Sequence, residues 1–360
     1  MASVFWRGCA GAALAALLAL GTGAAAQEDC SPENWKGCKG KPWVDGDTME
    51  TPMGSKWWPH PEWGAGDEAG STNWYTKPEV LKRALEASTG EKVYKLGHPY
   101  TGDMPLFGTR KFALRIPGLP TGGPYGANIL VYNDDYVATE LGQVGTQFDG
   151  LGHIGVQVGE PGDAGEMRWY NGVTATEMSG GGAGSAGLQK NGVEKLHPIV
   201  ARGVLIDVAA VRDQPMEAGD EITMEDVRKA LEAQGMADFQ FQPGDALIFR
   251  TGWERHWSDP ATFNNGEPGI GMEVARWAAE EVRAGLTGAD TWAVEVVPNP
   301  DPGCAFCVHA FLQARHGIVN QENMKLSELA EDGTYVFTYV YSPVPMAGAT
   351  GSTGAPIAIK

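Results

Sequence analysis

Hydrophobic residues recur along the chain with two different spacings, which predict a mixture of helices and strands. Apolar side chains three and four positions apart predict amphipathic helices at residues 78–87, from Thr223 onward and at residues 271–284. Thr223 and Asp226 have the pattern of a capping box, which marks the start of the second helix. Short runs rich in Val, Ile, Tyr and Phe predict strands, at residues 129–132, 204–208, 246–249, 292–297 and 335–341. Strands interspersed with amphipathic helices indicate a mixed α/β fold.

The beginning of the chain has the pattern of a secretory signal peptide. Arg7 supplies a positive charge, residues 10–20 are apolar, and residues 24–26 are three alanines that make a small-residue cleavage site. The apolar stretch is shorter than the about 20 residues that a membrane span needs. We therefore expect a signal peptide at residues 1–26 and one folded domain at residues 27–360. The protein is expected to be periplasmic or secreted, without membrane contact after cleavage.

The formal net charge of −18 at pH 7 argues against two classes of partner. Nucleic acids and anionic membranes are bound by basic patches, whereas this chain is strongly acidic. The charge does not identify a substrate, and we expect a small molecule as the partner.

Four cysteines follow residue 26, and an oxidising compartment favours disulfides between them. Cys30 and Cys38 are close enough in sequence to close a local loop, which predicts a disulfide between them. Cys304 and Cys307 have the CxxC spacing of redox and zinc motifs, but a lone pair lacks the second ligand pair of a structural zinc site. We expect either a local disulfide or two packed thiols there.

Residues 143–153 read QVGTQFDGLGH and place polar side chains where neither a solvated face nor an apolar core explains them. On an extended strand Gln143, Gln147 and Asp149 share one face, because residues two apart point the same way. The glycines that follow can reverse the chain and bring the imidazole of His153 back toward Asp149. A carboxylate, an imidazole and amide oxygens suit a divalent-metal pocket. The spacing alone also fits a polar strand with a hydrogen-bonded histidine, and it favours that interpretation slightly.

The same run resembles the metal-binding signature HxGTHxDxxxH of the cyclase family of metal-dependent hydrolases, the group of bacterial kynurenine formamidase and isatin hydrolase. Residues 145–146, Asp149 and His153 stand in register with it, whereas Gln143 and Gln147 replace its first two histidines. Other segments are similar to the family in the same order, at residues 63–73, 170–172, 201–207, 244–253, 308–312 and 317–323. The resemblance implies a single mixed α/β domain with the family's swivelling β/β/α-type architecture.

The resemblance also implies a divalent metal ion, zinc or manganese, with Gln143, Gln147, Asp149 and His153 as its ligands. An amide oxygen is a weaker donor than an imidazole nitrogen, so two glutamines should weaken zinc binding and favour a harder ion such as Mn²⁺ or Mg²⁺. Three outcomes stay open. The amides bind the metal, they orient the substrate beside a metal held by others, or the site holds no metal.

His309 and Glu322 are similar to the family's distal His and Glu, which complete the metal site or its proton relay. Together with His153 they are the catalytic residues that the resemblance implies. Gln313 lies one helical turn after His309 on the same face. Glu295 lies in the apolar run 292–297, and a buried carboxylate there must be either ion-paired or functional.

The leading hypothesis is a metal-dependent hydrolase, in which water activated by the metal attacks a small cyclic, amide or lactone carbonyl. The chain has no GxSxG motif, so the usual signal for a serine nucleophile is missing. Two alternatives remain open. One is a metal-dependent lyase or cyclase acting through an enolate, and the other is a solute-binding protein that has lost its metal. Since relatives form dimers or tetramers, a homo-oligomer is also expected.

Overall fold

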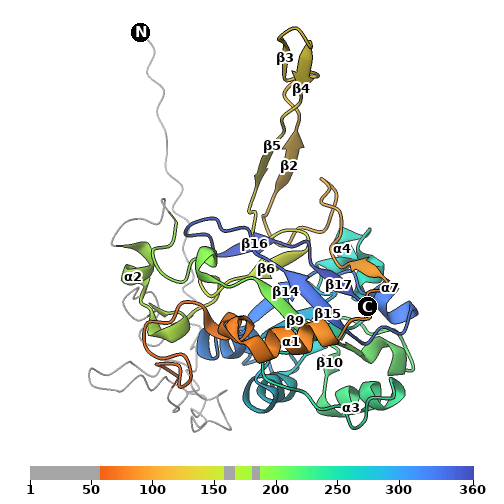
Figure 1. The fold of residues 1–360 in the computed structure, drawn as a ribbon. Helices are drawn as coiled ribbons and strands as arrows, with labels where there is room; N and C mark the ends of the chain where they lie inside the picture. The colour runs from red at the N-terminus through yellow and green to blue at the C-terminus, as the bar shows by residue number, and fades with distance from the viewer. Residues whose placement is uncertain (1–56, 158–166, 181–186) are drawn as a thin grey trace, which may run out of the picture.

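One nine-stranded sheet forms the centre of the protein (Figure 1). The computed structural model describes residues 57–157, 167–180 and 187–360. Four parallel neighbours, β9, β11, β13 and β14, make up the middle of the sheet, and antiparallel strands extend it on both sides. In spatial order the strands are β1 (Val93–Lys95), β17 (Ile357–Ile359), β15 (Val336–Tyr341), β9 (Ile199–Asp207), β11 (Ala246–Arg250), β13 (Leu286–Ala289), β14 (Val319–Glu322), β6 (Gln147–Asp149) and β16 (Gly351–Thr353).

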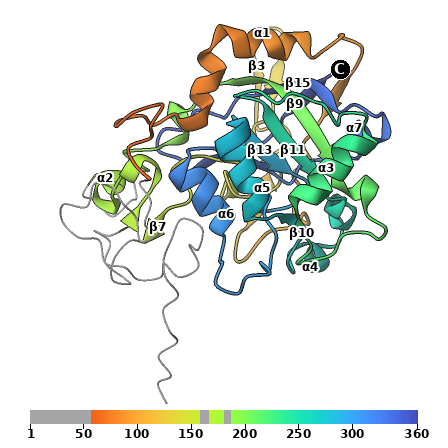
Figure 2. The same cartoon turned by 90° about the horizontal axis from the view of Figure 1, so that it is seen from below.

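The central strands are apolar on both faces because helices and loops cover both. In β9, Val204 and Ile206 point into one core cluster, which includes residues of the helices α3 (Met224–Ala233) and α5 (Met272–Arg276). Leu205, between them, points into a second cluster on the opposite face, since successive side chains of a strand alternate. Figure 2 looks from the side on which α3, α5 and α6 (Cys307–His309) lie.

The shorter elements lie around this sheet. The remaining α-helices are α1 (Pro78–Glu86), α2 (Ala175–Ser179), α4 (Pro260–Phe263) and α7 (Ser327–Glu331). Four two-residue strands form two small ladders, β7 (Val156–Gln157) with β8 (Met167–Arg168) and β10 (Glu221–Ile222) with β12 (Gly269–Ile270). A long hairpin, made of β2 (Phe112–Arg115), β3 (Gly122–Tyr125), β4 (Leu130–Tyr132) and β5 (Tyr136–Thr139), projects from the body (Figure 1).

Most of the predicted elements are present, and the mixed α/β prediction is confirmed. α1 occupies the first predicted helix, and the side chains of Thr223 and Asp226 form the capping box at the start of α3. The third predicted helix begins as α5 and continues as a wider π-helical turn, η8 (Trp277–Val282). The prediction of a strand at residues 292–297 was wrong. The backbone at Val294 has a φ of 61°, a left-handed conformation that interrupts an extended strand.

Several predictions concern parts of the chain that the structure does not describe. The expected signal peptide at residues 1–26, and Cys30 with Cys38, lie outside the described residues. Within the residues that are described, no helix combines the length and the apolar character that crossing a membrane requires.

Candidate functional site

Two neighbouring strands bring three of the predicted site residues together. β6 pairs antiparallel with β14, so that Gln147 lies opposite Glu322 and Asp149 opposite Asn320. Gln147 and Asp149 are two positions apart and therefore share one face of the sheet. Across the ladder the amide Nε2 of Gln147 donates to Glu322 Oε2 at 2.6 Å. Gln147, Asp149 and Glu322 are all at most 3% exposed, so the site begins as a buried polar patch inside the sheet.

Gln143 reaches this patch by a different route from the one predicted. The sequence suggested a continuous strand from Gln143 to Asp149, but β6 begins only at Gln147 and the preceding residues form turns. Gly145 has a φ of +62°, a conformation that glycine adopts without strain, and the chain bends there. Gln143 nevertheless lies beside Asp149, since its Nε2 donates to Asp149 Oδ1 at 3.0 Å.

His153 returns toward Asp149, as the glycine turn predicted. The backbone N–H of His153 donates to the carbonyl of Gly150, which closes the turn. His153 Nε2 lies 3.7 Å from Asp149 Oδ2, and its side chain is 23% exposed. Burial lowers the pKa of His153, so this imidazole is neutral near pH 7. It lies at the accessible edge of the site.

His309 comes from a different element, the helical segment of α6 and η9 (Ala310–Arg315). Its Nε2 lies 3.1 Å from Glu322 Oε1 and 3.8 Å from Asp149 Oδ2. Gln313, one turn later, donates from Nε2 to Asp149 Oδ2 at 3.3 Å. The structure thus brings His309, Glu322 and Asp149 together and adds Gln313 to them.

Glu295 holds the other side of the His309 ring. Its Oε1 lies 2.5 Å from His309 Nδ1 and also accepts the backbone N–H of His309 at 2.9 Å. Of the two alternatives for Glu295, the structure therefore shows the paired carboxylate. A carboxylate on Nδ1 fixes the orientation of the ring and directs Nε2 toward Asp149 and Glu322.

The site contains more negative than positive charge. Burial raises the pKa of Glu322 to about 7, and the neighbouring charge of Asp149 adds to this rise. Burial lowers the pKa of His309, but its hydrogen bonds to Glu295 and Glu322 outweigh burial and raise that pKa well above its usual value. In the described part of the chain, no Lys or Arg forms an ion pair with the carboxylates of Asp149, Glu295 and Glu322. A protonated His309 would balance only one of them.

These residues fit a divalent cation. One potential ligand atom from each of Asp149, His309 and Glu322 lies within 4.8 Å of the other two, and all three residues are buried. Carboxylate oxygen and imidazole nitrogen are donors that zinc and manganese accept. A dication would also offset the excess negative charge. The amides of Gln143 and Gln147 turn their nitrogens toward the carboxylates in this arrangement, and whether they are ligands stays a prediction.

A cavity of about 190 Å³ opens onto these residues. Sequence reasoning did not identify its walls, which are formed mainly by Phe107, Arg110, Ile154, Trp292 and Phe306. Phe107 stacks on Trp292 with ring centroids 4.4 Å apart, and Arg110 donates to Gln143 Oε1 at 3.3 Å. No local motif marks these residues, because they come from separate loops that only the fold brings together.

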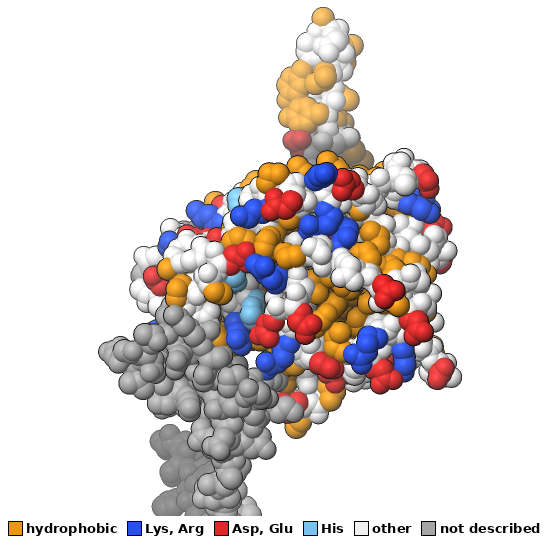
Figure 3. Space-filling model, turned by 60° about the horizontal axis from the view of Figure 1, so that its bottom comes forward, with side chains coloured by type: hydrophobic (Ala, Val, Ile, Leu, Met, Phe, Trp, Pro, Cys, Tyr) orange, Lys and Arg blue, Asp and Glu red, His pale blue; other side chains and the backbone are white. Residues whose placement is uncertain are grey.

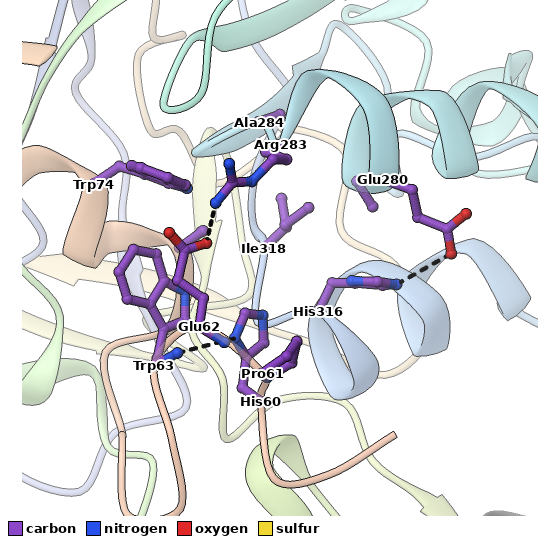
Figure 4. Close-up of a pocket in the computed structure, with 12 residues that line it drawn as sticks. His60, Pro61, Glu62, Trp63, Trp74, Glu280, Arg283, Ala284, His316 and Ile318 are labelled. Atoms are coloured by element: carbon purple, nitrogen blue, oxygen red, sulfur yellow. Dashed lines mark hydrogen bonds and ion pairs between the residues drawn. The ribbon is translucent and has the colours of Figure 1, made fainter. Parts of the chain in front are cut away.

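A larger cavity of about 500 Å³ lies elsewhere and contains none of the predicted site residues. Figure 4 shows that Arg283 pairs there with Glu62, at 2.6 Å, beside Trp63 and Trp74. The site residues predicted from the sequence therefore line the smaller of these two cavities.

Cys304 and Cys307 form a disulfide, which selects one of the two alternatives expected for this pair. Cys307 is the first residue of α6, and the two sulfurs lie near the Glu295 carboxylate. The disulfide thus restrains the loop that leads into the helix of His309.

Comparisons with known proteins identify the family and support the fold. The model of the family described as "Putative cyclase" matches residues 94–296, a span that includes the 143–153 run. A solved structure described as a novel cyclase is 30% identical, and it superposes with a TM-score of 0.70. The match covers 83% of this chain and 98% of that chain.

Two less similar structures share the fold. Isatin hydrolase A from Ralstonia solanacearum is 19% identical, with 79% of this chain and 99% of that chain covered and a TM-score of 0.54. Isatin hydrolase A from Labrenzia aggregata is 17% identical. The match covers 76% of this chain and 94% of that chain, with a TM-score of 0.52. No curated protein matches. The family model and the 30% identical structure together show that this chain belongs to the cyclase family.

Proposed function

We propose that the protein is a periplasmic or secreted metal-dependent hydrolase that acts on a small cyclic, amide or lactone carbonyl compound. The observation that carries this proposal is the buried group of Asp149, His309 and Glu322 at the base of a small cavity. The reaction class agrees with the names of the two isatin hydrolases that share the fold. The location rests on the signal-peptide pattern of the first 26 residues.

In this proposal Asp149, His309 and Glu322 hold the ion, with Gln143, Gln147 and His153 as further candidate ligands. A bound divalent cation would polarise a carbonyl oxygen and lower the pKa of water. Glu295 keeps the His309 ring in one orientation, so that the nitrogen facing the cavity is fixed before a ligand arrives.

The residues at the mouth would handle the proton and the substrate. His153 is neutral near pH 7 and lies at the accessible edge, where it can accept a proton from an attacking water molecule. Phe107 and Trp292 give the cavity flat apolar walls that suit a planar ring. Arg110 lies on the same wall and can orient an electron-rich substrate oxygen.

The experiment measures metal and activity in the same samples. Metal per chain is determined by elemental analysis after incubation with Zn²⁺ or Mn²⁺, and proton release is followed with a panel of lactones, cyclic imides and amides. We expect bound metal and hydrolysis in the wild type, and neither in Asp149→Ala, which removes the anionic donor of residues 143–153. Asp149→Asn keeps the side-chain volume, so it separates loss of the ligand from loss of folding.

Glu280→Gln, in the larger cavity, is the matched control and should retain both metal and activity. Full metal content in a folded Asp149→Ala protein would exclude Asp149 as a ligand.

One observation favours a second candidate, a solute-binding protein without metal. The amide nitrogens of Gln143 and Gln313 donate to Asp149, and that of Gln147 donates to Glu322. These donors satisfy the buried carboxylates without a cation. The metal measurement also decides this case. A wild-type protein that binds neither ion but does bind a panel compound would be a binding protein.

A further inference from the structure

The candidate cavity is bordered by exposed aromatic rings that are rare on the rest of the body. Exposed hydrophobic side chains gather along the hairpin that projects from the body (Figure 3). Apart from this hairpin, the described residues include only two exposed large aromatic side chains, Phe107 and Phe306, and both line the candidate cavity. Aromatic rings gathered at a cavity with a few polar groups are typical of a ligand-binding site. Phe306 therefore lies where a ligand in this cavity would cover it.

Phe306 extends the aromatic wall of the cavity toward the candidate metal ligands. Its ring centroid lies 6.1 Å from that of Trp292, which stacks on Phe107. The Phe306 ring is also nearly perpendicular to the His309 ring, with the two centroids 5.8 Å apart. A substrate whose carbonyl faces His309 would therefore place the adjoining part of its body against Phe306.

The backbone of Phe306 has a conformation that phenylalanine rarely adopts. Its φ is 53° and its ψ is 42°, in the left-handed region that favours glycine. A bulky residue keeps such a conformation only where its surroundings hold it there, and residues of this kind cluster at active sites and ligand-binding sites. The restraints on residue 306 therefore determine where its ring lies.

The disulfide between Cys304 and Cys307 supplies such a restraint. It closes a loop of four residues that contains Phe306, with the two cysteine Cα atoms 5.4 Å apart. At one end of the loop the N–H of Cys304 donates to the carbonyl of Asp301 at 3.0 Å. At the other end the carbonyl of Phe306 accepts from the N–H of Ala310 at 3.1 Å. Both ends are thus fixed, and the disulfide joins them across the left-handed residue.

The helix that carries His309 is held by a different residue. Glu295 accepts the backbone N–H of Val308 at 3.3 Å and that of His309 at 2.9 Å, so it fixes the first turn of the helix without the disulfide. The same carboxylate orients the His309 ring. The aromatic wall and the candidate metal ligands therefore have separate restraints, and one can be altered without the other.

We propose that Phe306 is a specificity-determining residue that favours substrates with a planar ring beside the carbonyl, and that the disulfide of Cys304 and Cys307 positions it. This proposal rests on the proposed function, since it concerns the substrate of the same cavity. Aromatic rings attract each other in perpendicular or offset arrangements beyond the effect of burial. A flat ring therefore gains from Phe306 what a saturated ring does not.

The test compares two ketones of similar size, acetophenone and cyclohexyl methyl ketone. Both carry a carbonyl group, neither can be hydrolysed, and the saturated ring is at least as apolar as the flat one. Dissociation constants are measured by NMR titration of the protein as isolated. Tighter binding of acetophenone therefore reports contact with the flat ring and requires no turnover.

Three variants separate the ring from its restraint. Phe306→Gly removes the ring, and glycine adopts the left-handed conformation without strain. Cys304→Ser/Cys307→Ser keeps the ring and removes the bond. Phe306→Tyr keeps an aromatic ring at the same place and is the matched control.

The wild type and Phe306→Tyr should bind acetophenone about threefold to tenfold more tightly than the saturated ketone, the range that one aromatic contact contributes. Phe306→Gly and the serine variant should bind the two ketones with similar affinity. Circular dichroism and metal per chain should be equal in all four proteins, because Glu295 and not the disulfide holds His309.

A wild type without preference for acetophenone would overturn the proposal, as would a Phe306→Gly variant that retains the preference. A folded serine variant that retains it would exclude the disulfide as the restraint. If the serine variant does not fold, a glycine inserted between Cys304 and Ala305 gives the same measurement, since it keeps the bond but lengthens the loop. A wild type that prefers acetophenone but contains no metal and hydrolyses no panel compound would support the role of Phe306 and contradict the hydrolase, so the two proposals can fail separately.

Discussion

Hydrogen bonds from amides organise the candidate site at the scale of single residues. Gln143 and Gln313 donate to the two oxygens of Asp149, and Gln147 donates to Glu322. Each buried carboxylate is thereby held in a fixed position. A metal ligand at 143 or 147 would have to turn its oxygen inward, which would release the carboxylate that its nitrogen now contacts.

The double variant Gln143→His/Gln147→His tests whether these amides are ligands. If they are, the variant should bind zinc more tightly, because imidazole nitrogen suits Zn²⁺ better than an amide oxygen does. We expect an increase of about tenfold, or about 1.4 kcal/mol, measured by calorimetric titration of both proteins. Activity can fall at the same time, since the native reaction depends on the metal's Lewis acidity and open positions.

Equal zinc affinities in a correctly folded variant would show that the glutamines are not ligands. A change in KM or substrate range with unchanged zinc affinity would then place them against the substrate.

Sequence reasoning identified the parts of the site that depend on local geometry or on the resemblance. The glycine turn between Asp149 and His153 is local, so the pattern alone predicted their approach. His309 and Glu322 were identified by resemblance, and they meet as expected. The contact of Glu295 with His309 could not be predicted, because it depends on the path of a loop wrongly interpreted as a strand. Arg110 likewise had no signal in the sequence.

At the scale of elements, prediction succeeded where the end of an element is encoded by its own residues. α3 begins where the Thr223 hydroxyl accepts from the Asp226 N–H and the Asp226 carboxylate accepts from the Thr223 N–H. In contrast, residues 277–282 form a wider π turn whose buried side chains pack into the sheet core. Periodicity cannot distinguish such a turn from a regular α-helix, because the apolar residues fall on nearly the same face.

Removing the cap of α3 should therefore destabilise the protein measurably. Thr223→Ala leaves the Asp226 N–H without its acceptor, which costs about 1 kcal/mol in the free energy of unfolding. Thr223→Ser retains the hydroxyl and should lose much less. Denaturant titration of the three proteins gives both values. Equal losses in the two variants would show that the β-branched methyl group, and not the hydroxyl, is what stabilises the start of the helix.

At the scale of the whole molecule, buried histidines make the stability depend on pH. Burial lowers the pKa of His316 to about 3, and Arg315, His60 and Arg276 add to this effect. The ring is therefore neutral at pH 7, and its 3.8 Å contact with Glu280 is not an ion pair there. Below its ordinary pKa of 6.5 the unfolded chain binds a proton that the folded chain excludes, so the stabilising contribution of neutral His316 is lost as pH falls toward 3.

His316→Gln should remove this contribution to the pH dependence. Between about pH 6 and pH 4 the free energy of unfolding of the wild type should fall faster than that of the variant, by up to about 1.4 kcal/mol per pH unit. Urea titrations across this range give the two slopes. Parallel curves would mean that the folded protein accepts the proton on His316 as readily as the unfolded chain does.

The segment before residue 57 is where sequence reasoning extends beyond the described structure, and mass spectrometry can test it. If residues 1–26 are a signal peptide, protein isolated from the periplasm should begin at Gln27 and should have lost Cys9 with the signal. Cys30 and Cys38 should then be joined, because the compartment is oxidising and the loop between them is short. A disulfide of this kind stabilises a domain by about 2–4 kcal/mol when the segment it closes is folded.

Peptide mapping without reduction detects the bond. The control is the chain expressed in the cytoplasm without residues 1–26, which should have both thiols free. Periplasmic protein with free thiols at both positions would exclude the disulfide, and periplasmic protein that retains residues 1–26 would exclude signal cleavage, so the two parts of the prediction can fail separately.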